Sequence, residues 1–281
     1  MTAAPTHRTT HTKRFVEYKK PVIFFVFIFM LQGIFSPARS EGTGHVEKER
    51  LMPLGDSLTA GDGSTHEMGY RKKIQDLLGV DTYQFVGPDS RGVLSDYQSE
   101  HTGKIGFGTE SLKAFVTTEM PAYFGPKDRK GIILLMVGTN DFLAAAFNVK
   151  NSVKNIMEMV DFIDQYNPRI KIYVACPIPI AFKEPSFLAY RTPPAGLTED
   201  TFPVFRKELI SSLAMRKRTK SNLYIVDMYS AFVNDETGLC YGNYKINCLV
   251  DGVHPNDAGY DVMGVVWANS INHCKKYDLC S

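Results

Sequence analysis

Residues 132–141 read IILLMVGTND, and this stretch decides the fold class. Its first six residues form a near-continuous apolar run, which is typical of a strand buried on both faces of a sheet. Gly138 ends the run, and polar residues follow it at once. Because sheets with such strands are covered by helices on both faces, the run indicates an α/β protein.

Short apolar runs and longer amphipathic segments alternate along the rest of the chain. We interpret four further runs as strands, namely residues 50–54, 83–86, 170–175 and 223–226. We interpret four segments as helices, namely residues 70–78, 149–166, 202–215 and 257–273, with Asn256 as the N-cap of the last. The alternation predicts a single α/β domain with a central parallel sheet over residues 41–281.

Three short polar blocks follow strands of this predicted sheet. They are Gly55-Asp56-Ser57-Leu58, Gly138-Thr139-Asn140-Asp141 and Asp251-Gly252-Val253-His254. Ligands bind beyond the carboxyl ends of parallel strands, so the blocks are expected to meet at one edge of the sheet. Together they supply a nucleophile, an oxyanion donor, and a general base with its carboxylate, which are the parts of a serine esterase.

Each block also has a purely structural interpretation. Ser57 can be an N-cap serine rather than a nucleophile. Asn140 can bond its own backbone, as loop asparagines often do, rather than an oxyanion. His254 can be an ordinary loop residue after an Asp251-Gly252 turn. The catalytic hypothesis makes Ser57 the nucleophile, His254 the general base, and Asp251 the residue that orients it.

A complete oxyanion hole needs a third donor besides the Ser57 N–H and the Asn140 side chain. The backbone of residues 101–108 is the candidate, because its glycines allow close approach. These glycines are Gly103, Gly106 and Gly108.

These residues resemble the GDSL, or SGNH, hydrolase family, whose four marker residues fall on Ser57, Gly106, Asn140 and His254. Residues 51–61, LMPLGDSLTAG, and 251–260, DGVHPNDAGY, are most similar to the carbohydrate esterases of that family, especially acetylxylan-esterase-like members. The resemblance covers residues 50–275. It implies a three-layer, flavodoxin-like α/β fold and ester hydrolysis without a cofactor. Phe107 stands where a tryptophan commonly follows the marker glycine in the sugar esterases. This resemblance makes Gly106 the preferred third oxyanion donor and Gly103 the alternative.

Three functions follow from this resemblance as expectations. The first is hydrolysis of short-chain esters, above all acetyl esters, on a carbohydrate. The second is a lipolytic or general short-chain carboxylesterase. The third is an inactive carbohydrate-binding or interaction protein on the same fold. The resemblance does not choose among them, because fold kinship does not fix the substrate.

The first 40 residues have the pattern of an export signal. A basic segment, residues 13–20, precedes an apolar run over residues 22–35, and Ala38-Arg39-Ser40 resembles a cleavage site. Cleavage would place the N-terminus at Glu41 and make the protein secreted or extracellular. An uncleaved run would instead tether the protein to a membrane, and a buried helix is the remaining alternative.

Charge and cysteine content constrain the partners further. Residues 1–40 carry +5, so the rest of the chain carries −3 of the total of +2 and has no basic footprint for nucleic acid. In an exported protein, close cysteines favour disulfides. The nearest pairs are Cys240 with Cys248 and Cys274 with Cys280, whereas Cys176 lies in an apolar run as a buried thiol. No cysteine or histidine spacing indicates a metal site.

Residues 177–201 interrupt the alternation, with prolines and no periodicity. Such a long loop in a compact domain is usually either functional or disordered. Because it starts at the carboxyl end of a predicted strand, we expect it either to overhang the site or to be a disordered insertion.

Overall fold

The computed structural model describes residues 47–125, 129–198, 200–233 and 248–276. All of them belong to one compact unit, Val46–Ser281. The predicted export signal, residues 1–40, lies outside the described residues. Among those described, no helix is long and apolar enough to cross a membrane.

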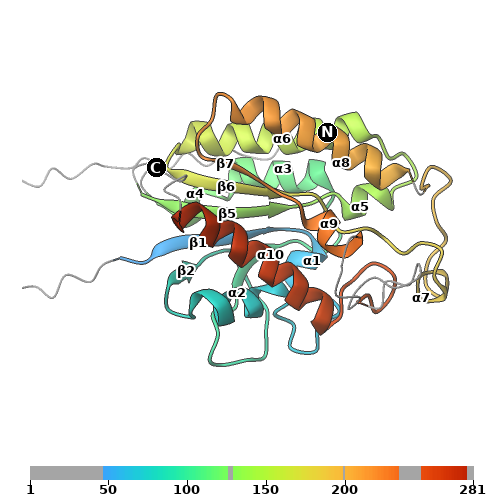
Figure 1. The fold of residues 1–281 in the computed structure, drawn as a ribbon, viewed down its shortest axis with the longest axis horizontal. Helices are drawn as coiled ribbons and strands as arrows, with labels where there is room; N and C mark the ends of the chain where they lie inside the picture. The colour runs from blue at the N-terminus through green and yellow to red at the C-terminus, as the bar shows by residue number, and fades with distance from the viewer. Residues whose placement is uncertain (1–46, 126–128, 199, 234–247, 277–281) are drawn as a thin grey trace, which may run out of the picture. The chain divides into compact units, whose positions relative to one another are not determined.

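A mixed but mostly parallel sheet forms the middle layer (Figure 1). Its strands are β1 Glu49–Gly55, β2 Tyr83–Phe85, β3 Asp89–Ser90, β4 Glu100–Gly103, β5 Gly131–Met136, β6 Ile170–Ala175 and β7 Leu223–Val226. The order is β3-β4-β1-β5-β6-β7, and β2 pairs with the first residues of β1 while β4 pairs with its last residues. Only the β3–β4 pair is antiparallel in this part of the chain.

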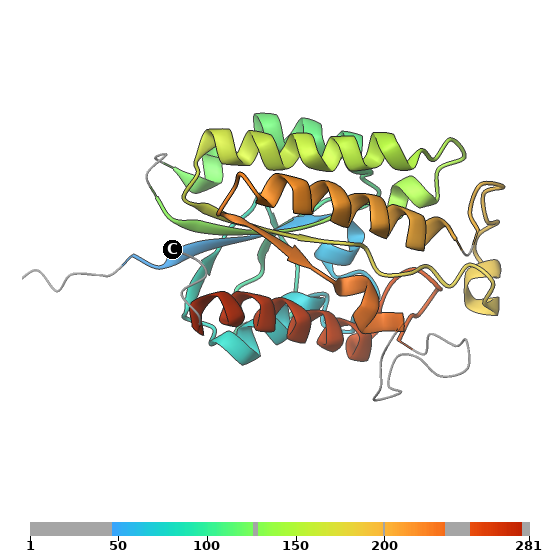
Figure 2. The same ribbon diagram turned by 45° about the horizontal axis from the view of Figure 1, so that its top comes forward.

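Helices cover both faces of the sheet (Figure 2). One face carries α3 Thr109–Thr118, α6 Val149–Tyr166 and α8 Thr201–Lys217; the other carries α2 Tyr70–Leu78 and α10 Asp257–Lys276. Successive β5 residues alternate between the two layers, since Ile133 packs with the first set of helices and Ile132 with the second. This double burial explains the uninterrupted apolar run that predicted the strand.

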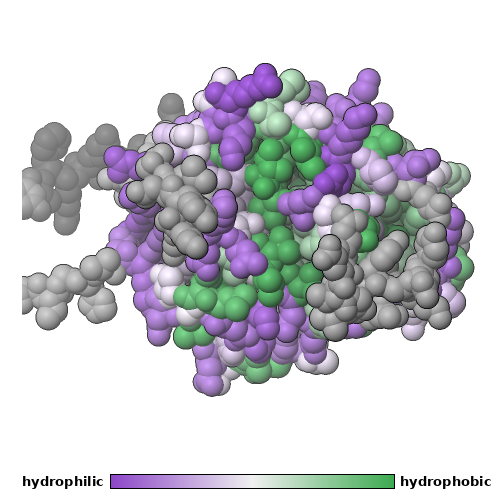
Figure 3. Space-filling model, in the orientation of Figure 1, coloured by the Kyte–Doolittle hydropathy of each residue, from purple (hydrophilic) through white to green (hydrophobic). Residues whose placement is uncertain are grey.

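Short helices fill the connections: α1 Ser57–Ala60, α4 Pro121–Phe124, α5 Thr139–Phe142, α7 Pro185–Leu188 and α9 Met228–Val233. On the face seen in Figure 1, hydrophilic residues cover most of the surface, and hydrophobic residues gather in a band across its middle (Figure 3).

The predicted α/β class is confirmed, and the predicted elements are present. Helices 70–78 and 149–166 and strands 170–175 and 223–226 have the bounds that the sequence indicated. Asn256 caps α10 as predicted, because its Oδ1 accepts the Gly259 N–H at 3.0 Å. β3, β4 and α3 are regular elements that the sequence did not predict.

Candidate active site

Ser57 opens the short helix α1 directly after β1, at the carboxyl edge of the sheet. Asp56 is the N-cap, and its Oδ1 accepts the Leu58 N–H at 3.0 Å. The structural role that was the alternative for Ser57 therefore belongs to its neighbour. Gly55 is required at the end of the strand, because a Cβ there would lie 2.2 Å from the Met136 carbonyl oxygen. This close approach sets Ser57 beside the end of β5.

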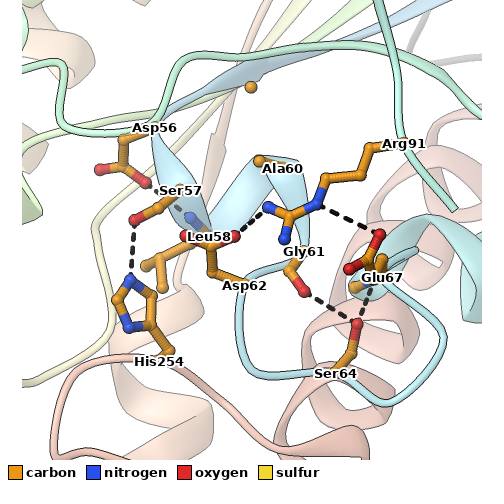
Figure 4. A network of polar contacts seen from close by, with 12 residues as sticks. Asp56, Ser57, Leu58, Ala60, Gly61, Asp62, Ser64, Glu67, Arg91 and His254 are labelled. Atoms are coloured by element: carbon orange, nitrogen blue, oxygen red, sulfur yellow. Dashed lines mark hydrogen bonds and ion pairs between the residues drawn. The ribbon is translucent and has the colours of Figure 1, made fainter.

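A chain of hydrogen bonds joins the serine to the last polar block. His254 Nε2 lies 3.0 Å from Ser57 Oγ, and His254 Nδ1 lies 2.9 Å from Asp251 Oδ2. Figure 4 shows the Ser57 hydroxyl directed at the imidazole ring. A hydroxyl, an imidazole and a carboxylate in this order can activate an oxygen nucleophile.

Asp251 is held in its ionised form by its surroundings. Partial burial raises its pKa, but hydrogen bonds from the His254 ring and from the backbone outweigh this and hold the pKa below its usual range. The backbone donors are the N–H groups of Val253 and His254, at 3.0 and 2.8 Å from Oδ1. Oδ2 therefore stays available to the imidazole as a charged acceptor.

Asp56 lies in the opposite electrostatic situation. It is fully buried, and its Oδ2 has no well-formed hydrogen bond among the described residues. Burial raises its pKa to about 6, an effect that Leu58, Thr139 and His254 only partly offset. Two ionisable carboxyls thus lie near the serine: Asp251, whose pKa is lowered, and Asp56, whose pKa is raised.

Asn140 reaches the same sheet edge from α5. Its Nδ2 donates one hydrogen bond to the Phe107 carbonyl at 3.0 Å, so one amide hydrogen remains for another acceptor. That bond also ties Asn140 to the turn that contains Gly106. The two residues reach this edge from different strands, β5 and β4.

The structure distinguishes the two glycines proposed as the third donor. The Gly103 N–H already donates to His101 Nδ1 at 2.9 Å, and a Cβ at Gly103 would lie 2.3 Å from the Ala60 nitrogen. Gly106 is exposed, with φ +80° in the turn closed by the Phe107 N–H and the Lys104 carbonyl. Within the described part of the chain, neither the Gly106 nor the Ser57 N–H has a hydrogen-bond acceptor. Gly106 therefore has a backbone donor to offer, and Gly103 has not.

Asp141 is a site residue whose role the sequence did not reveal. Its carboxylate accepts the Thr109 N–H at 2.8 Å and the hydroxyls of Thr109 and Ser152 at 2.7 Å each. It thereby clamps the starts of α3 and α6 to α5, the short helix that carries Asn140. The only sequence signal was a carboxylate at the end of the second polar block.

Two arginines stabilise the loops beside Ser57. Arg71 is buried and donates to four backbone carbonyls, those of Ala60, Glu67, Arg91 and Ser99. Arg91 pairs with Asp62, and its Nε lies 3.5 Å from Glu67 Oε2 (Figure 4). Their bonds join residues 60, 62 and 67 to residues 91 and 99, so the connection after α1 is supported from several sides.

Cysteines and candidate metal ligands add little to this edge. Cys176 is buried, with a pKa raised to about 12 by burial, as the apolar run predicted. Cys248 is also buried, but Cys240, Cys280 and the side chain of Cys274 lie outside the described residues, so the disulfide pairs stay a prediction. Among the residues described, no group of three or more His, Cys, Asp or Glu could hold a metal ion.

Comparisons with known proteins identify the family. The model of the GDSL-like lipase/acylhydrolase family matches residues 51–266. A multidomain esterase of Ruminococcus flavefaciens is 25% identical over 255 residues, which are 84% of this chain and 30% of the relative. The chain thus spans less than a third of that protein.

Solved structures share the fold. A family 3 carbohydrate esterase of Clostridium thermocellum has a TM-score of 0.61 at 18% identity, over 82% of this chain and 98% of that one. A family 3 carbohydrate esterase of Talaromyces cellulolyticus has a TM-score of 0.59 at 18% identity, over 81% and 98%. At such identities the likeness establishes the architecture. With the family match, it follows that this chain belongs to the GDSL-like lipase/acylhydrolase family and is an ester hydrolase.

Proposed function

We propose that the protein removes short acyl groups, above all acetyl, from a carbohydrate by covalent catalysis at Ser57. The observation that carries the proposal is the hydrogen-bonded chain from Ser57 Oγ through His254 to Asp251. Ser57 Oγ attacks the ester carbonyl carbon and passes its proton to His254 Nε2. The tetrahedral intermediate expels the alcohol, which takes that proton, and leaves an acyl-serine.

Water completes the cycle. It attacks the acyl-serine carbonyl and gives a proton to His254 Nε2, and the collapse of the second intermediate returns the proton to Ser57 and releases the acid. Asp251 remains ionised throughout and stabilises the imidazolium. The oxyanion of both intermediates accepts hydrogen bonds from the N–H groups of Ser57 and Gly106 and from Asn140 Nδ2.

Two lines of support favour a carbohydrate ester as substrate. The structural relatives described above include two family 3 carbohydrate esterases, and the curated relative is an esterase. The basic and apolar pattern of residues 1–40 adds support for export, which suits an enzyme that meets a polysaccharide outside the cell. A longer acyl chain would make the protein a lipolytic or general carboxylesterase instead.

The test compares the purified protein with Ser57→Ala and with Ser212→Ala, a matched serine substitution on α8. Hydrolysis of nitrophenyl esters from acetyl to long acyl chains is measured beside acetate release from acetylated xylan. We expect rapid acetyl cleavage, a steep decline with chain length, acetate release from xylan, and loss of all of these in Ser57→Ala alone.

Other outcomes would contradict the proposal in distinct ways. A preference for long acyl chains would identify a lipolytic enzyme. Glycan binding without turnover by the wild-type protein would indicate an inactive carbohydrate-binding protein. Equal activity of the Ser57→Ala variant and the wild-type protein would show that the nucleophile is misassigned.

A further inference from the structure

Asp251 has a second charged partner besides His254. Arg191 Nη1 lies 2.9 Å from Asp251 Oδ2, the oxygen that also accepts from His254 Nδ1, and 3.3 Å from the Asp251 carbonyl oxygen. The side chains of Arg191 and Asp251 are 30% and 19% exposed, so the pair is largely shielded from water. Arg191 belongs to the proline-rich stretch whose function the sequence left open.

Residues 181–191, here called the docking segment, pack against the loop that carries Asp251 and His254. The Ala181 N–H donates to the Gly252 carbonyl at 2.8 Å. Phe187 is completely buried, and a Cβ at Gly252 would lie 2.6 Å from the Phe187 Cβ. The contact therefore requires glycine at position 252. The docking segment is thus ordered structure packed on the loop that carries Asp251 and His254.

The guanidinium of Arg191 is held in place from within the docking segment. The Arg191 N–H donates to the Phe187 carbonyl at 2.9 Å, and the guanidinium lies 5.9 Å from the centroid of the Phe187 ring. The same buried phenylalanine thus anchors the segment and orients the arginine. A side chain fixed in this way loses little further freedom when it pairs with a carboxylate.

We propose that Arg191 is a positioning residue that acts on the reaction through Asp251. The inference rests on the proposed roles of Ser57, His254 and Asp251. Arg191 fixes the position of Asp251 Oδ2, the oxygen that meets His254 Nδ1. Its positive charge also offsets part of the negative charge that the Asp251 carboxylate presents to the imidazole.

Three charged side chains of the described structure are placed to act electrostatically on the His254 ring. Asp251 comes from its own loop, Arg191 from the docking segment, and Asp56 from the turn before α1. Arg191 is the only cation of the three, so its removal leaves two carboxyls that both stabilise the imidazolium. The acid limb of the pH profile then moves to higher pH.

The test measures kcat and KM against pH for the full-length protein with Arg191→Gln, Arg191→Met and Arg191→Lys, on nitrophenyl acetate. Arg216→Gln is the matched control, because it breaks another partly buried, although somewhat more exposed, arginine–aspartate pair, with Asp161, between α8 and α6. Arg191→Met retains an apolar stem over Phe187 and provides an uncharged variant even where the glutamine variant is unstable. Thermal unfolding of each variant measures any purely structural effect.

We expect Arg191→Gln and Arg191→Met to lower kcat about 10-fold with KM nearly unchanged. We also expect both variants to shift the midpoint of the acid limb of the pH profile to higher pH by about 0.5–1 unit. Arg191→Lys restores the position of the limb, and Arg216→Gln behaves as wild type. An unshifted acid limb in the folded uncharged variants would overturn the inference. Ser57→Ala in the same series separates the two claims, since activity in that variant contradicts the proposed function, whereas an inactive Ser57→Ala with an unshifted limb contradicts the role of Arg191 alone.

Discussion

His254 Nε2 lies 3.0 Å from Ser57 Oγ, although 197 residues separate them in the sequence. Ser57 follows a central strand of the sheet, and His254 lies in the loop before α10, which packs on α2. Gly63 brings the two regions together, because a Cβ there would lie 2.5 Å from the Pro255 carbonyl and 3.1 Å from the His254 Cβ. The distance between the two atoms is thus fixed by backbone packing as well as by their hydrogen bond.

Asp251→Asn is expected to lower kcat by a factor on the order of 10⁴, because an amide neither stabilises the imidazolium nor imposes the correct tautomer of His254. Steady-state hydrolysis of nitrophenyl acetate gives the measurement. Asp161→Asn, on α6, is the control. An Asp251→Asn enzyme with more than a tenth of wild-type kcat would remove Asp251 from the mechanism.

Asn140→Ala is expected to lower kcat by roughly 10²–10³ with little change in KM, since in the proposed mechanism its amide meets the oxyanion only after attack. Asn151→Ala, an exposed asparagine on α6, controls for the substitution itself. A higher KM at unchanged kcat would mean that Asn140 binds the ground state.

Asp141→Ala is expected to lower the free energy of unfolding by about 2 kcal/mol, because three donors lose a charged acceptor. These donors are the Thr109 N–H and the hydroxyls of Thr109 and Ser152. Urea unfolding measures the loss. Asp141→Asn keeps one acceptor oxygen, so its free energy of unfolding should fall by less. Equal stability of the alanine variant and the wild-type protein would show that Asp141 does not clamp the two helices.

The buried Asp56 carboxyl makes a contribution to the free energy of unfolding that falls as pH rises. Its pKa rises from the usual range of an aspartate to about 6 on folding, so its favourable contribution is complete below about pH 4 and is lost as pH rises through about 6. Asp56→Asn keeps the acceptor for the Leu58 N–H but does not ionise. Its stability relative to wild type should therefore increase between about pH 4 and 7, on the order of 2 kcal/mol.

Thermal and urea unfolding of both proteins across this pH range give the measurement. A difference that stays constant with pH would show that Asp56 does not ionise in the native state over that interval.

The sequence predicted those parts of the fold that apolar burial determines. The apolar run of β5 and the periodicity of α6 follow from side chains that face a helix layer or a sheet, so both patterns can be read directly from the sequence. β4 was missed because it buries His101, Thr102 and Gly103, none of which reads as an apolar strand residue. His101 is accommodated as a neutral ring, since burial and neighbouring cations lower its pKa to about 3.

The residues of the candidate site likewise divide into those that the sequence revealed and those that it did not. Ser57, Asn140, Asp251 and His254 could be identified because each follows a strand or precedes a helix in a short polar block. Arg191 and the clamp at Asp141 could not, because their partners are tertiary: Asp251 lies 60 residues from Arg191, and Thr109 lies 32 residues from Asp141. No local sequence pattern indicates which arginine pairs with a given carboxylate.

The most direct test of the central claim is covalent labelling of the serine. A fluorophosphonate, which reacts with activated serine hydroxyls, is incubated with the wild-type protein and with His254→Ala, and the modified residue is mapped by peptide mass spectrometry. We predict one label, on Ser57, that abolishes hydrolysis in proportion to its stoichiometry, and almost none in His254→Ala because the hydroxyl is no longer activated. Full hydrolytic activity of an enzyme labelled at Ser57, or a stoichiometric label on another residue, would contradict the account.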